Sequence, residues 1–146
     1  MKKSQKGFTL VELIVVIAII GVLAAILVPS MMGYVKKSRL KKANSNAKLV
    51  FNTAASECTE QETIGDPVGA GTYKHVGGNG DGTNLGAAVD KALENNGGSV
   101  GEWGCTINDE GNVTNAQWRE TDKDDTVGQW PNPSNDPASL IPWAYN

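Results

Sequence analysis

A predominantly apolar run over residues 13–35 is the dominant feature of the sequence. No charged residue occurs in it, and a helix over these positions would be about 35 Å long, enough to cross a bilayer core of roughly 30 Å. Lys2, Lys3 and Lys6 precede the run and would hold the N-terminus in the cytoplasm, with the rest of the chain outside. The pattern therefore predicts a membrane-spanning helix over residues 8–35.

After this run the pattern changes to that of an amphipathic helix. Small apolar residues recur on one face at steps of three and four: Ala43, Ala47, Val50, Ala54 and Cys58. No glycine or proline interrupts residues 34–64. We therefore expect one helix from about residue 9 to about residue 60, in which residues 36–60 continue the apolar segment and lay one narrow face on a folded head.

Residues 61–146 are expected to form that globular head, a small antiparallel β-sheet. Residues 63–83 are rich in glycine and are predicted to be a loop. A short extra helix is expected over residues 85–95, a hairpin over residues 100–119 and a further strand near residues 126–130. The predicted fold class is α+β, with a long N-terminal helix whose first half is transmembrane and whose second half packs on the sheet.

Charge is divided unevenly along the chain. Nine of the 13 lysines and arginines lie in residues 1–48, whereas 15 of the 16 acidic residues follow residue 48. An acidic head behind a basic neck is the reverse of what a nucleic-acid-binding domain needs. The neck suits a solvated helix face beside lipid headgroups, or contact with the acidic head of another subunit.

Cys58 and Cys105 are the only cysteines in the chain. If the head lies outside the cytoplasm, a disulfide between them is expected, and closing that loop would contribute on the order of 4 kcal/mol in the chain-entropy account. Two cysteines this far apart, with one histidine in the chain, do not predict a metal site or a redox role. No catalytic constellation is visible, so we expect no enzyme and no cofactor.

Glu12 is the one acidic residue at the start of the apolar segment, where a carboxylate is costly in a membrane. Two accounts of it stay open. In a capping box, Thr9 would be the N-cap and Glu12 the third helical residue. In the second account, a cut between Gly7 and Phe8 leaves an ammonium on Phe8, which pairs with Glu12 of a neighbouring helix and fixes the axial register.

Gly21 and Pro29 interrupt the apolar run. Proline removes one helical hydrogen bond and clashes with the carbonyl four residues earlier, that of Ala25. The helix is therefore expected to be weakest between Gly21 and Pro29, as a kink that a membrane helix tolerates.

The residues from Lys6 to Leu13, KGFTLVEL, followed by the apolar run, resemble the class III signal of type IV prepilins and type II secretion pseudopilins. The resemblance implies cleavage after Gly7 by a membrane prepilin peptidase that also N-methylates Phe8. It implies that Glu12 guides subunit docking. It also implies that the stretch carrying Gly21 and Pro29 loses helicity in an assembled filament.

The resemblance implies a structural subunit of a type IV pilus-like filament, a helical homopolymer assembled through the N-terminal helix. Its expected partners are other copies of itself, the peptidase and N-methyltransferase, the pilus assembly platform and the membrane. Residues 1–7 are then a leader, and the precursor lies in the inner (cytoplasmic) membrane with its head outside before it joins a surface pilus. Two alternatives stay open: a pseudopilin of a secretion or competence system, and a single-pass anchored extracellular binding domain.

Overall fold

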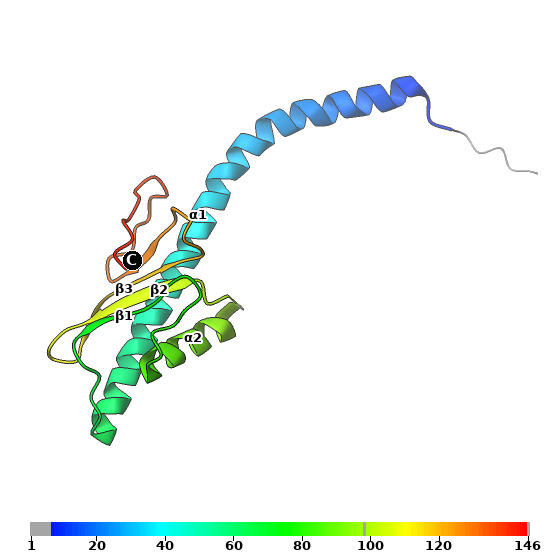
Figure 1. The fold of residues 1–146 in the computed structure, drawn as a ribbon. Helices are drawn as coiled ribbons and strands as arrows, with labels where there is room; N and C mark the ends of the chain where they lie inside the picture. Colours follow the sequence, from blue (N-terminus) through cyan, green and yellow to red (C-terminus); the bar gives the residue numbers. More distant parts are fainter. Residues whose placement is uncertain (1–6, 98, 146) are drawn as a thin grey trace, which may run out of the picture. The chain divides into compact units, whose positions relative to one another are not determined.

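The computed structural model describes residues 7–97 and 99–145, so all of the predicted leader except Gly7 lies outside the described part. The chain divides into two compact units at Lys36 and Lys37, and each is described by itself. The first holds the apolar part of the long helix, and the second holds the rest of that helix and the head. The elements in chain order, drawn in Figure 1, are α1 (Leu10–Ile64), β1 (Gly71–His75), α2 (Asn84–Gly97), β2 (Glu102–Ile107), β3 (Val113–Arg119) and β4 (Gly128–Trp130).

Helix α1 confirms the expectation of one long helix and ends four residues later than predicted. Among the described residues it is the one helix long and apolar enough to cross a membrane. The helix is continuous through Gly21 and through Pro29, which lies inside it. Loss of helicity in that stretch therefore remains a prediction for the assembled filament, and the structure of the single chain does not contain it.

The four strands form one antiparallel sheet in the order β1-β2-β3-β4. The predicted hairpin is confirmed as β2 and β3, with a bulge between Thr106 and Ile107, and β4 falls within the strand expected near residues 126–130. The prediction of a loop throughout residues 63–83 is wrong in part, because β1 forms there. Its five residues pair with β2, so a long-range partner supplies the backbone hydrogen bonds that local composition does not reveal.

The core of the head lies between one face of the sheet and two helices (Figure 1). The sheet contributes Trp103, Cys105, Ile107, Ala116 and Trp118, α1 contributes the small residues predicted from its pattern, and α2 contributes Leu85, Val89 and Leu93. The small residues let α1 approach the sheet closely. At Gly128, an added Cβ would overlap the backbone of Ala43 in α1, so backbone packs directly on backbone there.

The C-terminal tail, which follows β4, covers part of the face of the sheet opposite to the helices. Tyr145 is buried over Gly104, and its hydroxyl lies 3.1 Å from both Thr106 Oγ1 and Asn115 Nδ2. The buried side chain of Gln117 accepts a hydrogen bond from the Ala144 N–H at 2.9 Å. The tail is thereby held to the sheet by side-chain contacts and not by strand pairing.

Candidate assembly site

The start of α1 is a complete capping box. Thr9 donates two hydrogen bonds to Glu12 Oε2, one from its backbone N–H at 2.8 Å and one from its hydroxyl at 2.6 Å. The Glu12 N–H donates in return to Thr9 Oγ1 at 3.3 Å, and the Leu13 N–H donates to the Thr9 carbonyl at 3.3 Å. The capping account of Glu12 is therefore confirmed, since these bonds satisfy N–H groups that a helix start leaves unpaired.

The capping box engages one oxygen of the Glu12 carboxylate. In the described part of the chain, Oε1 of Glu12 has no hydrogen-bond partner, while Oε2 accepts both bonds from Thr9. A carboxylate oxygen can accept further charged donors. The cap therefore fixes the carboxylate at the helix start and leaves one oxygen available to a cation from outside the chain.

Gly7 and Phe8 precede the helix and are exposed. Phe8 is 88% exposed, and a Cβ added at Gly7 would meet nothing within 4 Å. Within residues 7–97 and 99–145, nothing therefore imposes a steric requirement for glycine at residue 7. Such a requirement would come from a protein that binds this segment.

The apolar part of α1 has no partner in the structure described. The large apolar side chains from Phe8 to Val35 are 44–88% exposed. Soluble monomers rarely expose so large a continuous apolar surface. Lipid or other protein chains must cover it, and the exposed positions include the surroundings of Gly21 and Pro29.

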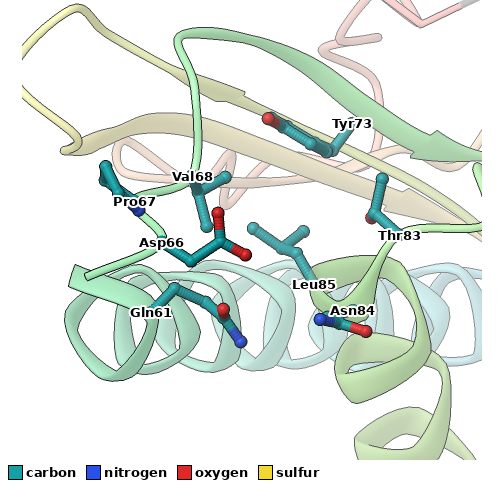
Figure 2. A pocket seen from close by; sticks show the side chains of 8 residues that line it. All are labelled: Gln61, Asp66, Pro67, Val68, Tyr73, Thr83, Asn84 and Leu85. Atoms are coloured by element: carbon teal, nitrogen blue, oxygen red, sulfur yellow. The ribbon is translucent and has the colours of Figure 1, made fainter. Parts of the chain in front are cut away.

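A hollow of about 200 Å³ lies in the head where the end of α1, β1 and the start of α2 meet. Figure 2 shows the carboxylate of Asp66 pointing into it, between Val68 and Leu85, with the amides of Gln61 and Asn84 nearby. Its lining holds one carboxylate and lacks a nucleophile next to a base. Within residues 7–97 and 99–145, no group of three His, Cys, Asp or Glu residues is arranged to hold a metal ion.

The head contains carboxylates whose structural contacts the sequence did not reveal. Asp90 of α2 accepts a hydrogen bond from Trp103 Nε1 at 2.7 Å and lies 3.0 Å from His75 Nδ1. Glu102 of β2 accepts hydrogen bonds from the Gly77 N–H at 2.8 Å and from Arg119 Nε at 2.7 Å. The Asp90 contacts join α2 to β1 and β2, and the Gly77–Glu102 bond fastens the glycine-rich loop to the sheet. No local spacing signals these contacts because their partners lie far apart in the sequence.

Cys58 and Cys105 are both buried in the core cluster, and the structure has them as free thiols. The predicted disulfide is thus not present in it. Burial first, and then the nearby Cys58 and Asp81, raise the pKa of the Cys105 thiol to about 12. As thiols, the two side chains act as small apolar core residues. Their pairing under oxidising conditions remains a prediction.

Comparisons with known proteins identify a family motif at the start of the chain. Residues 2–28 match the family described as the prokaryotic N-terminal methylation motif. Over 62 residues the chain is 42% identical to a fimbrial protein of Pseudomonas aeruginosa, covering 42% of this chain and 40% of that protein. The chain therefore carries the prokaryotic N-terminal methylation motif and is similar, over about two-fifths of its length, to type IV fimbrial proteins.

Two further relatives are also fimbrial proteins. A type IV major fimbrial protein FimA of Dichelobacter nodosus is 45% identical over 58 residues, which are 40% of this chain and 36% of that protein. The fimbrial protein EcpC of Eikenella corrodens is 56% identical over 43 residues, or 30% and 28% of the two chains. The chain thus spans about two-fifths or less of each relative. No solved structure matches it significantly.

Proposed function

We propose that this chain is a prepilin, the structural subunit of a type IV pilus-like filament. The observation that carries the proposal is the N-terminal segment, in which the N-terminal methylation motif leads into a capped helix with an exposed apolar surface. Relatives that match about two-fifths of the chain are named fimbrial proteins, which supports the same role. We infer that the chain acts by self-assembly and not by catalysis.

The proposed maturation begins with the chain in the cytoplasmic membrane and its head outside. A prepilin peptidase cuts after Gly7, which removes Lys2, Lys3 and Lys6 and leaves a free amino group on Phe8. The same enzyme methylates that amine. Losing the three lysines lowers the cost of withdrawing the helix from the membrane, because no lysine then has to pass through the bilayer core.

Glu12 then sets the register between neighbouring subunits in this proposal. Its Oε2 remains in the cap with Thr9, and its Oε1 accepts a charge-assisted hydrogen bond from the Phe8 ammonium of a neighbour. Between packed apolar helices, an unpaired carboxylate is strongly penalised. Axial positions that leave Glu12 unpaired are therefore excluded, and the exposed apolar surfaces bury each other in a single register.

Two alternatives differ from this proposal in a measurable way. A pseudopilin would undergo the same processing but would stay in the cell envelope as a short filament. A single-pass anchored binding domain would keep its leader, because a plain anchor needs no cut. The motif around Gly7 and Glu12 favours the two filament functions over the anchor.

Substituting Gly7→Val tests the proposed maturation. The larger side chain is expected to block the cut, so the protein should remain in the membrane at its precursor mass and be absent from mechanically sheared surface filaments. Gly69→Ala is a matched control in the head, where an added Cβ meets nothing within 4 Å, and it should be processed as the wild type is. Efficient processing of Gly7→Val would contradict the assigned site, and wild-type protein that stays in the envelope would favour the pseudopilin.

We also propose that Cys58 and Cys105 form a disulfide once the head is outside the cytoplasm. The filament protein is then expected to be lighter by two hydrogen atoms before reduction than after it, and unfolding alone should not expose thiols to iodoacetamide. If the two cysteines were instead buried thiols, iodoacetamide would react with them once the chain unfolds, without any reductant. Two reactive thiols after unfolding in the absence of reductant would contradict the disulfide, and Cys58→Ala, with one thiol left, calibrates the labelling.

A further inference from the structure

The head unit begins with exposed basic residues on α1 that have no ionic partner in the chain. Lys37, Arg39 and Lys41 are exposed, and none of them forms an ion pair within the described residues. The next basic residue, Lys42, does have a partner, since its Nζ lies 2.9 Å from Glu120 Oε1. We name Lys37, Arg39 and Lys41 the basic neck.

The same unit contains a hollow whose charge is opposite to that of the basic neck. It is a different hollow from the one shown in Figure 2. It has a volume of about 320 Å³ and lies between the last turns of α1 and the turn that joins β2 to β3. Glu62, Asp109 and Glu110 line it and are exposed, and none forms an ion pair in the part of the chain that the structure describes. Val68 and Cys58 supply apolar wall. We name this site the acidic hollow.

The acidic hollow has the chemistry to bind a long basic side chain. The last turn of α1 contains no basic residue, so the partial negative charge of the helix C-terminus adds to that of Glu62. An apolar wall beside carboxylates suits lysine and arginine, whose stems pack on apolar surface while their charged ends donate hydrogen bonds to the carboxylates. Nothing in the described chain neutralises these three carboxylates.

The basic neck and the acidic hollow of one subunit cannot meet. Arg39 and Glu62 lie on the same helix, and at 1.5 Å per residue they are about 35 Å apart along its axis. No side chain spans that distance. A contact between the two surfaces must therefore join two copies of the chain.

We propose that, in the filament, the basic neck of one subunit docks into the acidic hollow of another copy. The inference rests on the proposed function, because it requires a homopolymer. Residues 49–146 of each copy bring 15 acidic and four basic side chains, so every neck in a homopolymer faces strongly anionic neighbours. Lipid headgroups would neutralise the neck only until the subunit leaves the membrane. If the helices run parallel to the filament axis, the paired subunits are shifted by about 35 Å along it.

Charge reversal in the full-length protein tests this docking through the yield of sheared filaments. One variant reverses the neck (Lys37→Glu, Arg39→Glu, Lys41→Glu), a second reverses the hollow (Glu62→Lys, Asp109→Lys, Glu110→Lys), and a third combines both sets. Each single-surface reversal is expected to lower the yield at least about tenfold, because like charges then face each other. The combined variant should recover most of the lost yield. Lys91→Glu and Glu94→Lys, which are exposed on α2, are matched controls expected to leave the yield unchanged.

The amount of processed subunit in the membrane must equal that of the wild type for each variant compared. If a triple variant does not accumulate, the single substitutions Arg39→Glu and Glu62→Lys and the double variant that combines them provide the same test. Unchanged yields after both reversals would overturn the inference. A loss with the neck reversal that the combined variant does not recover would also overturn it and would favour lipid headgroups as the partner. Absence of wild-type protein from sheared filaments would instead contradict the proposed function itself.

Discussion

Replacing Glu12 with alanine is expected to leave the protein processed but to lower its yield in sheared filaments by at least about 100-fold. The cut site at Gly7 and Phe8 is intact in this variant, so the mature form should accumulate in the membrane. Assembly fails because the Phe8 ammonium of each neighbour loses its carboxylate partner within an apolar surface. The measurement compares the mature protein in sheared material and in membranes.

The cap at the start of α1 is lost in the same variant, and two controls separate the two effects. Glu12→Gln keeps an oxygen that accepts the hydrogen bonds from Thr9 but has no charge. Thr9→Ala removes the hydroxyl of the cap and keeps the Glu12 carboxylate. The account predicts that Glu12→Gln fails to assemble and that Thr9→Ala largely succeeds. Normal filaments from Glu12→Gln would show that capping is enough and would contradict the register pairing.

Replacing Gly128 with alanine is expected to destabilise the head by about 3 kcal/mol. An added Cβ at this position overlaps the carbonyl group of Ala43 and approaches the backbone N of Asn44. Both groups are helix backbone, so relief requires α1 or β4 to move away, which opens the core between them. Chemical denaturation of the detergent-solubilised full chain, followed by tryptophan fluorescence, measures the change.

A change of less than about 0.5 kcal/mol for Gly128→Ala would contradict the direct packing of β4 on α1. Gly69→Ala is again the matched control, because an added Cβ there meets nothing within 4 Å. It is expected to change the free energy of unfolding by no more than about 0.5 kcal/mol.

Helix α1 and the hairpin of β2 and β3 could be predicted because their signals are local. The apolar period of α1 and the alternation through Trp103, Cys105 and Ile107 specify an element and its buried face without knowledge of the rest of the fold. Strand β1 was missed because its five residues lie in a glycine-rich segment and become a strand only by pairing with β2. The contacts of the tail and of Asp90 and Glu102 likewise depend on the assembled sheet.

The candidate assembly site could likewise be predicted from the sequence only where its contacts are local. The bond between Thr9 and Glu12 spans three residues, so its spacing was visible in the sequence and the structure confirms it. The pairing of Glu12 with Phe8 lies between chains and remains a prediction. The oxidation state of Cys58 and Cys105 also depends on the compartment, which local sequence does not specify; the structure has two thiols.

The mass of the N-terminal peptide of the native protein tests the central claim most directly. The account predicts that protein from mechanically sheared surface filaments begins at Phe8 and is heavier by one methyl group. It also predicts that the precursor beginning at Met1 is confined to the membrane. A chain found only in membranes with an intact Met1 or Lys2 terminus would contradict maturation and assembly and would identify a plain anchor.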